Sequence, residues 1–215
     1  MATSNKIVDL RNLLAERFPH SSLQAANRLT TKIAVLDHAT EGGLPKNSVT
    51  EIISPHVSAG SASLIHALLQ AAHRDRYFLA LIDGRDSFDP EFIGNLYLQN
   101  LLWVRCYNAM EAVKAADLLL RDGNFPLVIL DLVLNPANEL RKIQQTSWYR
   151  LQRLVEPMAT AFLVLTRRSM VSSAQVKLTL DNYWTLKDLE SRDIVSELKI
   201  HVQRIHGAGQ IAGVP

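Results

Sequence analysis

Residues 51–63 read Glu-Ile-Ile-Ser-Pro-His-Val-Ser-Ala-Gly-Ser-Ala-Ser, and the order of residue types in this stretch indicates the class of fold. An apolar strand runs into a turn of small residues, and an apolar helix follows the turn. This order is the setting in which a Walker A phosphate-binding loop has a structural meaning. The end of the stretch departs from that motif, because Ser61 and Ala62 follow Gly60 where Lys and Ser or Thr are required. The sequence therefore predicts the fold of a phosphate-binding loop without its cation and without the hydroxyl that binds Mg²⁺.

The composition fits a single domain with a buried core. The chain has 215 residues, of which 47% are hydrophobic, and a net charge of +2. A charge this close to neutral means that any contact with nucleic acid must come from a local basic patch. The one cysteine, Cys106, excludes an internal disulfide and fits a buried core residue in a reducing compartment. The sequence has no signal-peptide pattern and no apolar run of about 18 residues, so we expect a cytoplasmic protein without a membrane segment.

Short apolar runs alternate with helical patterns through the middle of the chain. The predicted strands cover 49–53, 78–82, 101–104, 127–130 and 161–166. The predicted helices between them cover 61–74, 90–98, 109–121 and 139–156. This alternation predicts an α/β fold, with a mostly parallel sheet covered by helices on both faces. Residues 176–180 and 198–202 alternate apolar and polar side chains, which predicts antiparallel C-terminal strands with one face in water.

The two ends of the chain differ from this core. Residues 5–17 have apolar side chains at helical spacing, with Ser4 as the N-cap, and predict an amphipathic helix that docks on its own core or on a partner. We therefore expect an N-terminal helical appendage over 1–30 and a core domain over 31–206. The Gly-rich stretch 207–215 is expected to form a flexible tail.

Three segments in order resemble the ATPase core of the RecA family. Residues 42–52 resemble the lead-in to its Walker A loop, and residues 81–90 resemble the segment after its second core strand. Residues 127–131, Leu-Val-Ile-Leu-Asp, are similar to its Walker B strand, in which an acid follows an apolar strand. The resemblance covers about residues 37–166 and implies a RecA-like (P-loop NTPase-type) fold.

The departures from that family concern the chemistry. Ser54 stands for the first glycine of the loop, Arg85 stands where the family has the glutamate that activates water, and Leu132 follows Asp131 in place of a small polar residue. Loss of the lysine, the Mg²⁺ hydroxyl and the base removes most of the machinery of phosphoryl transfer. We therefore expect no efficient ATP hydrolysis, no catalytic residue, and no ATP or Mg²⁺ as a required cofactor.

The remnant of the nucleotide site allows two interpretations. Its candidate residues are Ser58, Ala59, Gly60, Ser61, Ala62, Ser63 and Asp131. Backbone N–H groups at a helix N-terminus can bind an anion without the lysine, but the loop can equally survive as a fold element that binds nothing, which we favour. Asp131 can anchor a metal, cap the next helix or pair with Arg85, and we favour a structural role.

Basic residues follow the Walker B strand and the strand after it. The candidates for nucleic-acid contact are Arg141, Lys142, Arg150, Arg153, Arg167 and Arg168, with Trp148 and Tyr149 among them. Basic residues interleaved with aromatic ones can hold phosphates and stack bases, although a solvated helix face is the commoner meaning of such a run. His66 and His73 have no nearby thiols or paired acids, so we expect no metal site.

A short RecA-like chain with a damaged nucleotide site, a basic helix and a Gly-rich tail most resembles the ImuA group. The resemblance implies an accessory role in translesion DNA synthesis, with a Y-family-like partner of the ImuB type and an error-prone DNA polymerase. Single-stranded DNA, RecA and a second copy of the chain are further candidate partners. The alternatives are a weak RecA-type ATPase in DNA repair or recombination, and a cell-division inhibitor similar to SulA.

Overall fold

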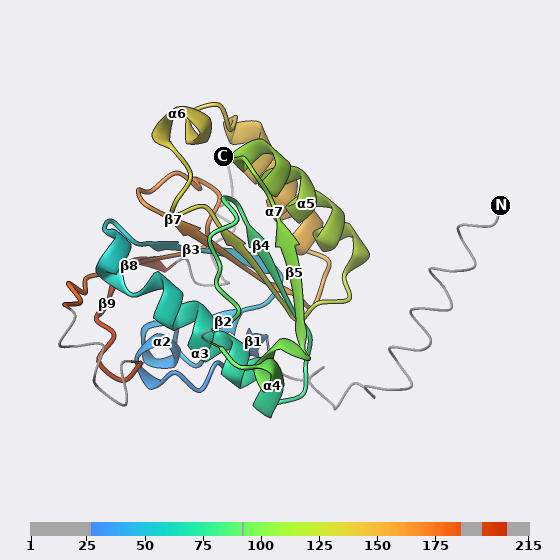
Figure 1. The fold of residues 1–215 in the computed structure, drawn as a ribbon. Coiled ribbons are helices and arrows are strands. Elements are labelled where there is room, and N and C mark those ends of the chain that lie inside the picture. Colours follow the sequence, from blue (N-terminus) through green and yellow to red (C-terminus); the bar gives the residue numbers. More distant parts are fainter. Residues whose placement is uncertain (1–26, 92, 186–194, 206–215) are drawn as a thin grey trace, which may run out of the picture.

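The computed structural model describes residues 27–91, 93–185 and 195–205 (Figure 1). The predicted helix over 5–17 and the predicted tail over 207–215 lie outside these residues. The described chain forms a central sheet between two layers of helices, which is the α/β architecture expected from the alternating pattern.

The central sheet has seven strands in the order β5-β4-β6-β7-β3-β8-β9. The strands are β3 (Ser48–Ile53), β4 (Leu79–Asp83), β5 (Leu101–Arg105), β6 (Leu127–Asp131), β7 (Ala161–Thr166), β8 (Val176–Leu180) and β9 (Ile200–Ile205). All neighbouring pairs from β5 to β8 are parallel, and only β9 runs antiparallel, against β8. The expected mostly parallel sheet is therefore confirmed, with one antiparallel strand at its edge.

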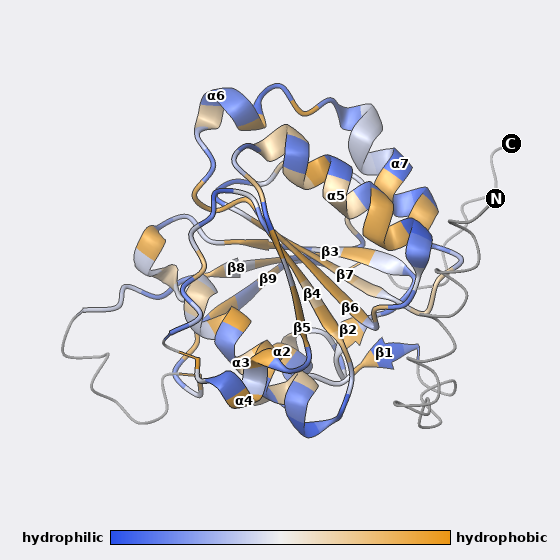
Figure 2. Cartoon of the chain, turned by 45° about the vertical axis from the view of Figure 1, so that its right-hand side comes forward, coloured by the Kyte–Doolittle hydropathy of each residue, from blue (hydrophilic) through white to orange (hydrophobic). Residues whose placement is uncertain are grey.

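Helices cover both faces of the sheet (Figure 2). One layer contains α2 (Ala34–Ala39), α3 (Ser61–Arg74) and α4 (Asn95–Leu98), and the other contains α5 (Ala109–Asp122), α6 (Ala137–Leu140) and α7 (Gln145–Val155). Leu64 and Leu68 of α3 bury one face of the sheet, and Trp148 and Leu151 of α7 bury the other. Because these strands are parallel, their carboxyl ends lie at the same edge of the sheet, which is where α/β proteins place their ligand-binding sites.

Two predicted helices are shorter in the structure. The helix expected over 90–98 is reduced to α4, because Gly94 before it has a φ of +78°, outside the helical range. The helix expected over 139–156 is two helices, α6 and α7, joined by residues 141–144. Ile143 is buried in this connection, and Gln144 is extended with a ψ of 147°, so the chain leaves the helical path to bury an apolar side chain.

The C-terminal strands also differ from the prediction. β8 is parallel to β3 and buried on both faces, so only β9 has the expected antiparallel pairing. The polar member of its pattern, Lys177, is 8% exposed and places its ammonium 2.7 Å from the carboxylate of the fully buried Glu51. The alternating pattern thus came from a buried ion pair and not from a wet face. The two-residue strands β1 (Arg28–Leu29) and β2 (Leu44–Pro45), and the helix α2, were not predicted.

Candidate functional site

A cavity of about 360 Å³ opens at the carboxyl ends of β4 and β6, beside the start of α3. It brings together Ser61, Ala62, Ser63 and Asp131 from the predicted set. The other predicted loop residues, Ser58, Ala59 and Gly60, lie outside its lining. The helix α3 begins at Ser61 without a side-chain cap, so its first N–H groups have no intrahelical acceptor.

The loop before α3 is closed on itself. Val57–Ala59 form a 3₁₀ turn in which the N–H of Ala59 donates to the carbonyl of His56 at 3.2 Å. A phosphate-binding loop needs its successive N–H groups to point into one open concavity. Here one of these groups is already bonded inside the loop.

The C-terminal segment covers this loop from outside. The N–H of Trp184 donates to the carbonyl of Ser58 at 3.2 Å, and the hydroxyl of Tyr183 lies 2.7 Å from Nε2 of His56. Gly60 has a φ of +102°, and a Cβ added to it would lie 2.7 Å from Leu198 and 2.9 Å from the Trp184 indole nitrogen. The glycine is therefore required by the close approach of Trp184 and Leu198, with no phosphate needed to explain it.

Asp83 and Asp131 end neighbouring strands and are paired in register. Asp83 is buried and accepts hydrogen bonds from the N–H groups of Arg85, Ser87 and Phe88. Asp131 is only partly exposed, and its Oδ1 accepts one hydrogen bond, from the N–H of Val133 at 2.9 Å. Burial raises the pKa of Asp131 to about 6, against the opposing effect of the Val133 N–H and with a further rise from Asp83.

Arg85, at the position of the missing base, turns away from the cavity. Its Nη1 donates to the carbonyl of Tyr107 at 3.0 Å and lies 3.5 Å from Oε1 of Glu139. The predicted alternative in which Arg85 pairs with Asp131 is therefore wrong. Likewise, Asp131 caps the turn to Val133 and does not reach the next helix, because α6 begins only at Ala137 and has no side-chain cap.

Glu139 forms an ion pair with Arg85 and links several loops. Its Oε2 accepts hydrogen bonds from the N–H of Ala109 at 3.1 Å and from the amide of Asn135 at 3.2 Å. The Ala109 N–H, the Asn135 amide and the nearby Arg85 and Lys142 lower the pKa of the Glu139 carboxyl. The same Asn135 amide donates to the carbonyl of Gly84 at 2.7 Å, so the segments after β4, β5 and β6 are tied at one point. Sequence reasoning missed this junction, because its contacts join residues far apart in the chain. Arg85 and Glu139 are separated by 54 residues, and Ala109 and Glu139 by 30.

The lining of the cavity does not fit a nucleoside triphosphate. Asp89 and Asp131 both line it, and across the described parts of the chain it receives neither a Lys nor an Arg side chain. A triphosphate brings several negative charges, which a P-loop neutralises with a lysine and a metal ion. In the same described ranges, His, Cys, Asp and Glu side chains form no group of three or more that could hold a metal ion.

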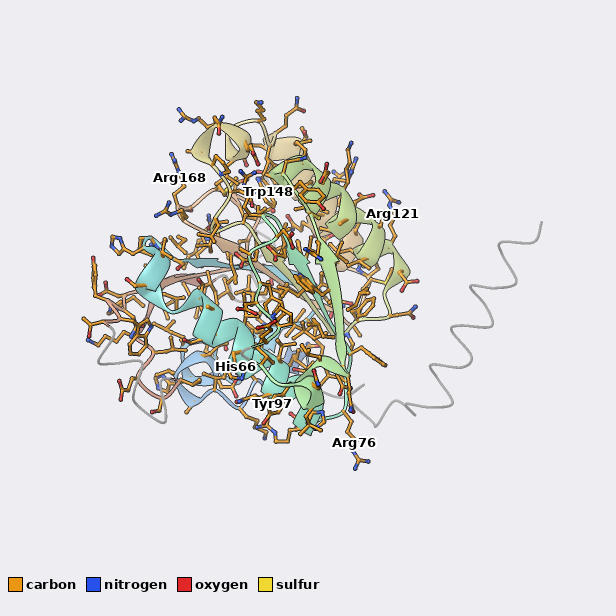
Figure 3. The ribbon with its side chains drawn as sticks, in the orientation of Figure 1. His66, Arg76, Tyr97, Arg121, Trp148 and Arg168 are labelled. Atoms are coloured by element: carbon orange, nitrogen blue, oxygen red, sulfur yellow. The ribbon has the colours of Figure 1, made fainter. Side chains whose placement is uncertain are left out.

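The structure divides the predicted basic residues into two groups. Arg141 and Lys142 follow α6, while Arg167 and Arg168 follow β7, and all four are exposed at the carboxyl edge of the sheet. Figure 3 shows Arg168 on the side of α6 and Arg121 at the far end of α5. These four side chains surround loops and not a helix face, so the prediction that Arg141 and Lys142 lie on the same helix as Arg150 is wrong.

The second group lies on α7 and is partly neutralised. Arg150 lies 2.9 Å from Asp117 of α5, and that carboxylate also holds Arg121 at 2.9 Å. Trp148 is 1% exposed in the core, so it cannot stack a base, whereas Tyr149 is 51% exposed. Arg153 is exposed on the same helix. The helix thus offers less free positive charge than its sequence indicates.

A family model of the RecA N-terminal domain matches residues 18–173. The chain belongs to the RecA N-terminal domain family. Protein RecA of Acinetobacter baumannii is 29% identical over 165 residues, which cover 74% of this chain and 46% of that protein. Protein RecA of Frankia alni is 34% identical over 94 residues, which cover 43% and 27%, and Protein RecA of Xylella fastidiosa is 31% identical over 123 residues, which cover 55% and 35%. This RecA-like chain spans less than half the length of these relatives.

Proposed function

We propose that the protein is a catalytically degenerate RecA-like accessory factor of the bacterial DNA damage response. In this role it acts in the cytoplasm during translesion DNA synthesis, as in the ImuA group, by binding a Y-family-like partner of the ImuB type and an error-prone DNA polymerase. Membership of the RecA family supports the broader assignment to DNA repair and recombination. In the described part of the chain, no helix is long and apolar enough to cross a membrane.

The cavity at the carboxyl edge of the sheet carries the proposal that catalysis is lost. Asp131 and Asp89 line it without a lysine or arginine from the described residues, and Arg85 is held outside by Tyr107 and Glu139. A protein that keeps the fold but loses the cation and the base has no means to stabilise the charge that develops during phosphoryl transfer. Its remaining surfaces can still bind partners.

The exposed loop group of Arg141, Lys142, Arg167 and Arg168 is the proposed contact for single-stranded DNA. None of its four residues lines the cavity, so DNA binding does not need a nucleotide in the cavity. Arginines that are free of carboxylate partners can neutralise phosphates, and each such contact adds to the salt dependence of binding.

A damage-induced mutagenesis assay in the source bacterium tests the accessory role. A deletion strain should lose damage-induced mutations, and Asp131→Asn should restore them as well as the natural chain, because no catalysis is needed. The double variant Arg167→Glu with Arg168→Glu should restore fewer damage-induced mutations than the natural chain. If Asp131→Asn fails while the protein remains folded and abundant, the proposal of a non-catalytic role is wrong.

A nucleotide assay tests the same proposal in solution. Millimolar Mg-ATP should leave the melting temperature unchanged, whereas a ligand at 100 times its Kd would stabilise the fold by about 2.7 kcal/mol. Co-purification with the ImuB-type protein of the same genome should be equal with and without ATP. A clear rise in melting temperature that Asp131→Asn abolishes would favour the weak-ATPase alternative.

A further inference from the structure

The cavity beside α3 has an apolar wall large enough for a small ligand. Its volume of about 360 Å³ lies within the range of small-molecule sites. Side chains from three segments form the wall: Val57, Ile65, Phe88, Ile93, Val133 and Leu134. Ile65, Ile93 and Val133 are themselves buried, so the wall is part of the packed core and is held in place.

The ionisable side chains that line the cavity have a net negative charge. Its two acids are Asp89 and Asp131, and its serines and His66 add no cation. Burial lowers the pKa of the His66 imidazole, which favours the neutral ring. Arg85, two residues before Ser87 of the lining, is held by Glu139, and Arg105 contacts both carboxylate oxygens of Asp86 at 2.6 and 2.7 Å.

Asp89, whose Oδ1 accepts the N–H of Glu91, and Asp131 both have spare acceptor capacity, and Asp131 lies at the end of the buried strand β6. The Oδ1 of Asp131 accepts the N–H of Val133, and no other described residue donates a hydrogen bond to this carboxylate. Asp83, by contrast, already receives several backbone N–H groups. The hydroxyl side chains of Ser61 and Ser63 line the same space and offer further acceptors.

We propose that this cavity binds a compact organic cation, with an amidinium or guanidinium group on Asp131 and an apolar body against Ile65, Phe88 and Val133. Planar cations of this type donate parallel N–H groups that match a carboxylate. The family's phosphate ligand has the opposite charge, so the site has changed its preference and not only lost its affinity. This assignment does not depend on the role in DNA repair.

Three ligands of nearly equal shape test the charge preference: benzamidine, benzamide and benzoate. Their Kd values for the full-length protein should be measured by ligand-observed NMR titration. A charge-assisted hydrogen bond to a partly buried carboxylate should favour benzamidine over benzamide by about tenfold, and benzoate should bind weakest. Equal binding of all three, or tighter binding of benzoate, would overturn the proposal.

Matched variants locate the site. Asp131→Asn keeps the shape and the acceptor for Val133, and it should reduce benzamidine affinity about tenfold while leaving benzamide unchanged. Glu156→Gln removes one negative charge on the exposed end of α7, outside the cavity, and should change neither Kd. Ser63→Trp fills the cavity and should weaken both ligands, which reports the site even if Asp131→Asn alters the fold. If benzamidine binds equally well to Asp131→Asn and to Ser63→Trp, the cation binds elsewhere and the assignment is wrong.

Discussion

The loop before α3 and the loop after β7 follow neighbouring parallel strands, yet the structure treats them in opposite ways. Residues 54–60 contain no Asp, Glu, Lys or Arg and are covered by Trp184 and Leu198. Residues 167–175 start with two exposed arginines, and their backbone donates hydrogen bonds to a buried carboxylate. The first loop, which binds phosphate in an active P-loop protein, is closed, and the positive charge lies on the second.

The buried carboxylate that fastens the second loop is Glu51. Its Oε1 accepts hydrogen bonds from the N–H groups of Met170 at 2.7 Å and Val171 at 3.1 Å, and its Oε2 lies 2.7 Å from the ammonium of Lys177. Lys177 also donates to the hydroxyl of Ser169 at 2.7 Å. These hydrogen bonds and the ion pair to the Glu51 carboxylate fix the backbone of the loop. Arg167 and Arg168 therefore precede a rigid segment.

The largest expected effect comes from breaking this ion pair. Glu51→Ala leaves the Lys177 ammonium buried without a counter-charge and removes the acceptor of the Met170 and Val171 N–H groups. Loss of one partner of a buried pair typically costs about 3–5 kcal/mol of unfolding free energy. Urea denaturation measures this cost. The double variant Glu51→Leu with Lys177→Met should recover only the part of the cost that comes from the unpaired ammonium, because the Met170 and Val171 N–H groups still lack their acceptor. A single variant within about 1 kcal/mol of the natural chain would show that the pair is not desolvated.

The closed loop offers the next largest effect. Gly60→Ala should cost about 1–3 kcal/mol, because alanine is strained at a φ of +102° and its Cβ would collide with Leu198 and Trp184. Gly94→Ala is the matched control, since Gly94 has a φ of +78° but no atom within 4 Å of its added Cβ. Thermal melting followed by tryptophan fluorescence separates them. Equal losses for the two variants would mean that Trp184 and Leu198 do not cover the loop in solution.

Asp131 gives a smaller effect with a definite dependence on pH. Its pKa is about 6 in the folded protein against 3.8 unfolded, so the folded state binds more protons between these values and loses stability as the pH rises. Asp131→Asn removes this penalty and keeps an acceptor for the Val133 N–H. The variant should be about 1–2 kcal/mol more stable at pH 7.5, less than the full shift implies because the side chain is partly exposed.

The same variant should lose its advantage in acid. Near pH 4 both forms of the folded chain carry a neutral side chain at this position, so the two unfolding free energies should converge. Urea titrations at pH 7.5 and 4.2 measure the difference. A variant that is destabilised equally at both pH values would show that the carboxylate is stabilised by a cation or by hydrogen bonds.

The sequence predicted the parts of the fold that repeat a local pattern. The apolar strand over 127–130 and the helix over 61–74 were predicted correctly, because the spacing of the apolar residues within each segment matches the side that is buried. The break at Ile143 and the burial of Lys177 were not, since each depends on a partner far along the chain: Lys177 pairs with Glu51, and Ile143 packs in the cluster beneath α5 and α7. Long-range pairing of this kind leaves no periodic signal.

The candidate site shows the same limit. The absent lysine was visible at Ser61, and from it the loss of catalysis was inferred. The direction of Arg85 was not visible, because it depends on Tyr107 and Glu139 from two other segments. Nor was the division of the basic residues, since Asp117 on α5 decides that Arg150 is neutralised while Arg167 and Arg168 stay exposed.

The smallest effect on stability, and the most direct test of where DNA lies, comes from two pairs of arginines. Arg167→Ala with Arg168→Ala removes two exposed charges from the loop, and Arg150→Ala with Arg153→Ala removes the same net charge from α7. Both double variants should change the unfolding free energy by less than about 0.5 kcal/mol, because exposed charges contribute little. Any difference between them in DNA binding therefore reports the position of the charge and not the integrity of the fold.

The two pairs should differ in how the affinity for single-stranded DNA depends on salt. The loop pair should flatten this dependence by about 0.7 in log–log slope for each phosphate that the variant no longer neutralises. The α7 pair should flatten the slope less than the loop pair, since Asp117 already neutralises Arg150 and, within the described residues, Arg153 is the one exposed, unpaired charge that this variant removes. Fluorescence anisotropy over a series of salt concentrations gives both slopes. If the α7 pair has the larger effect, the DNA lies on the helix and the division drawn between the two basic groups fails.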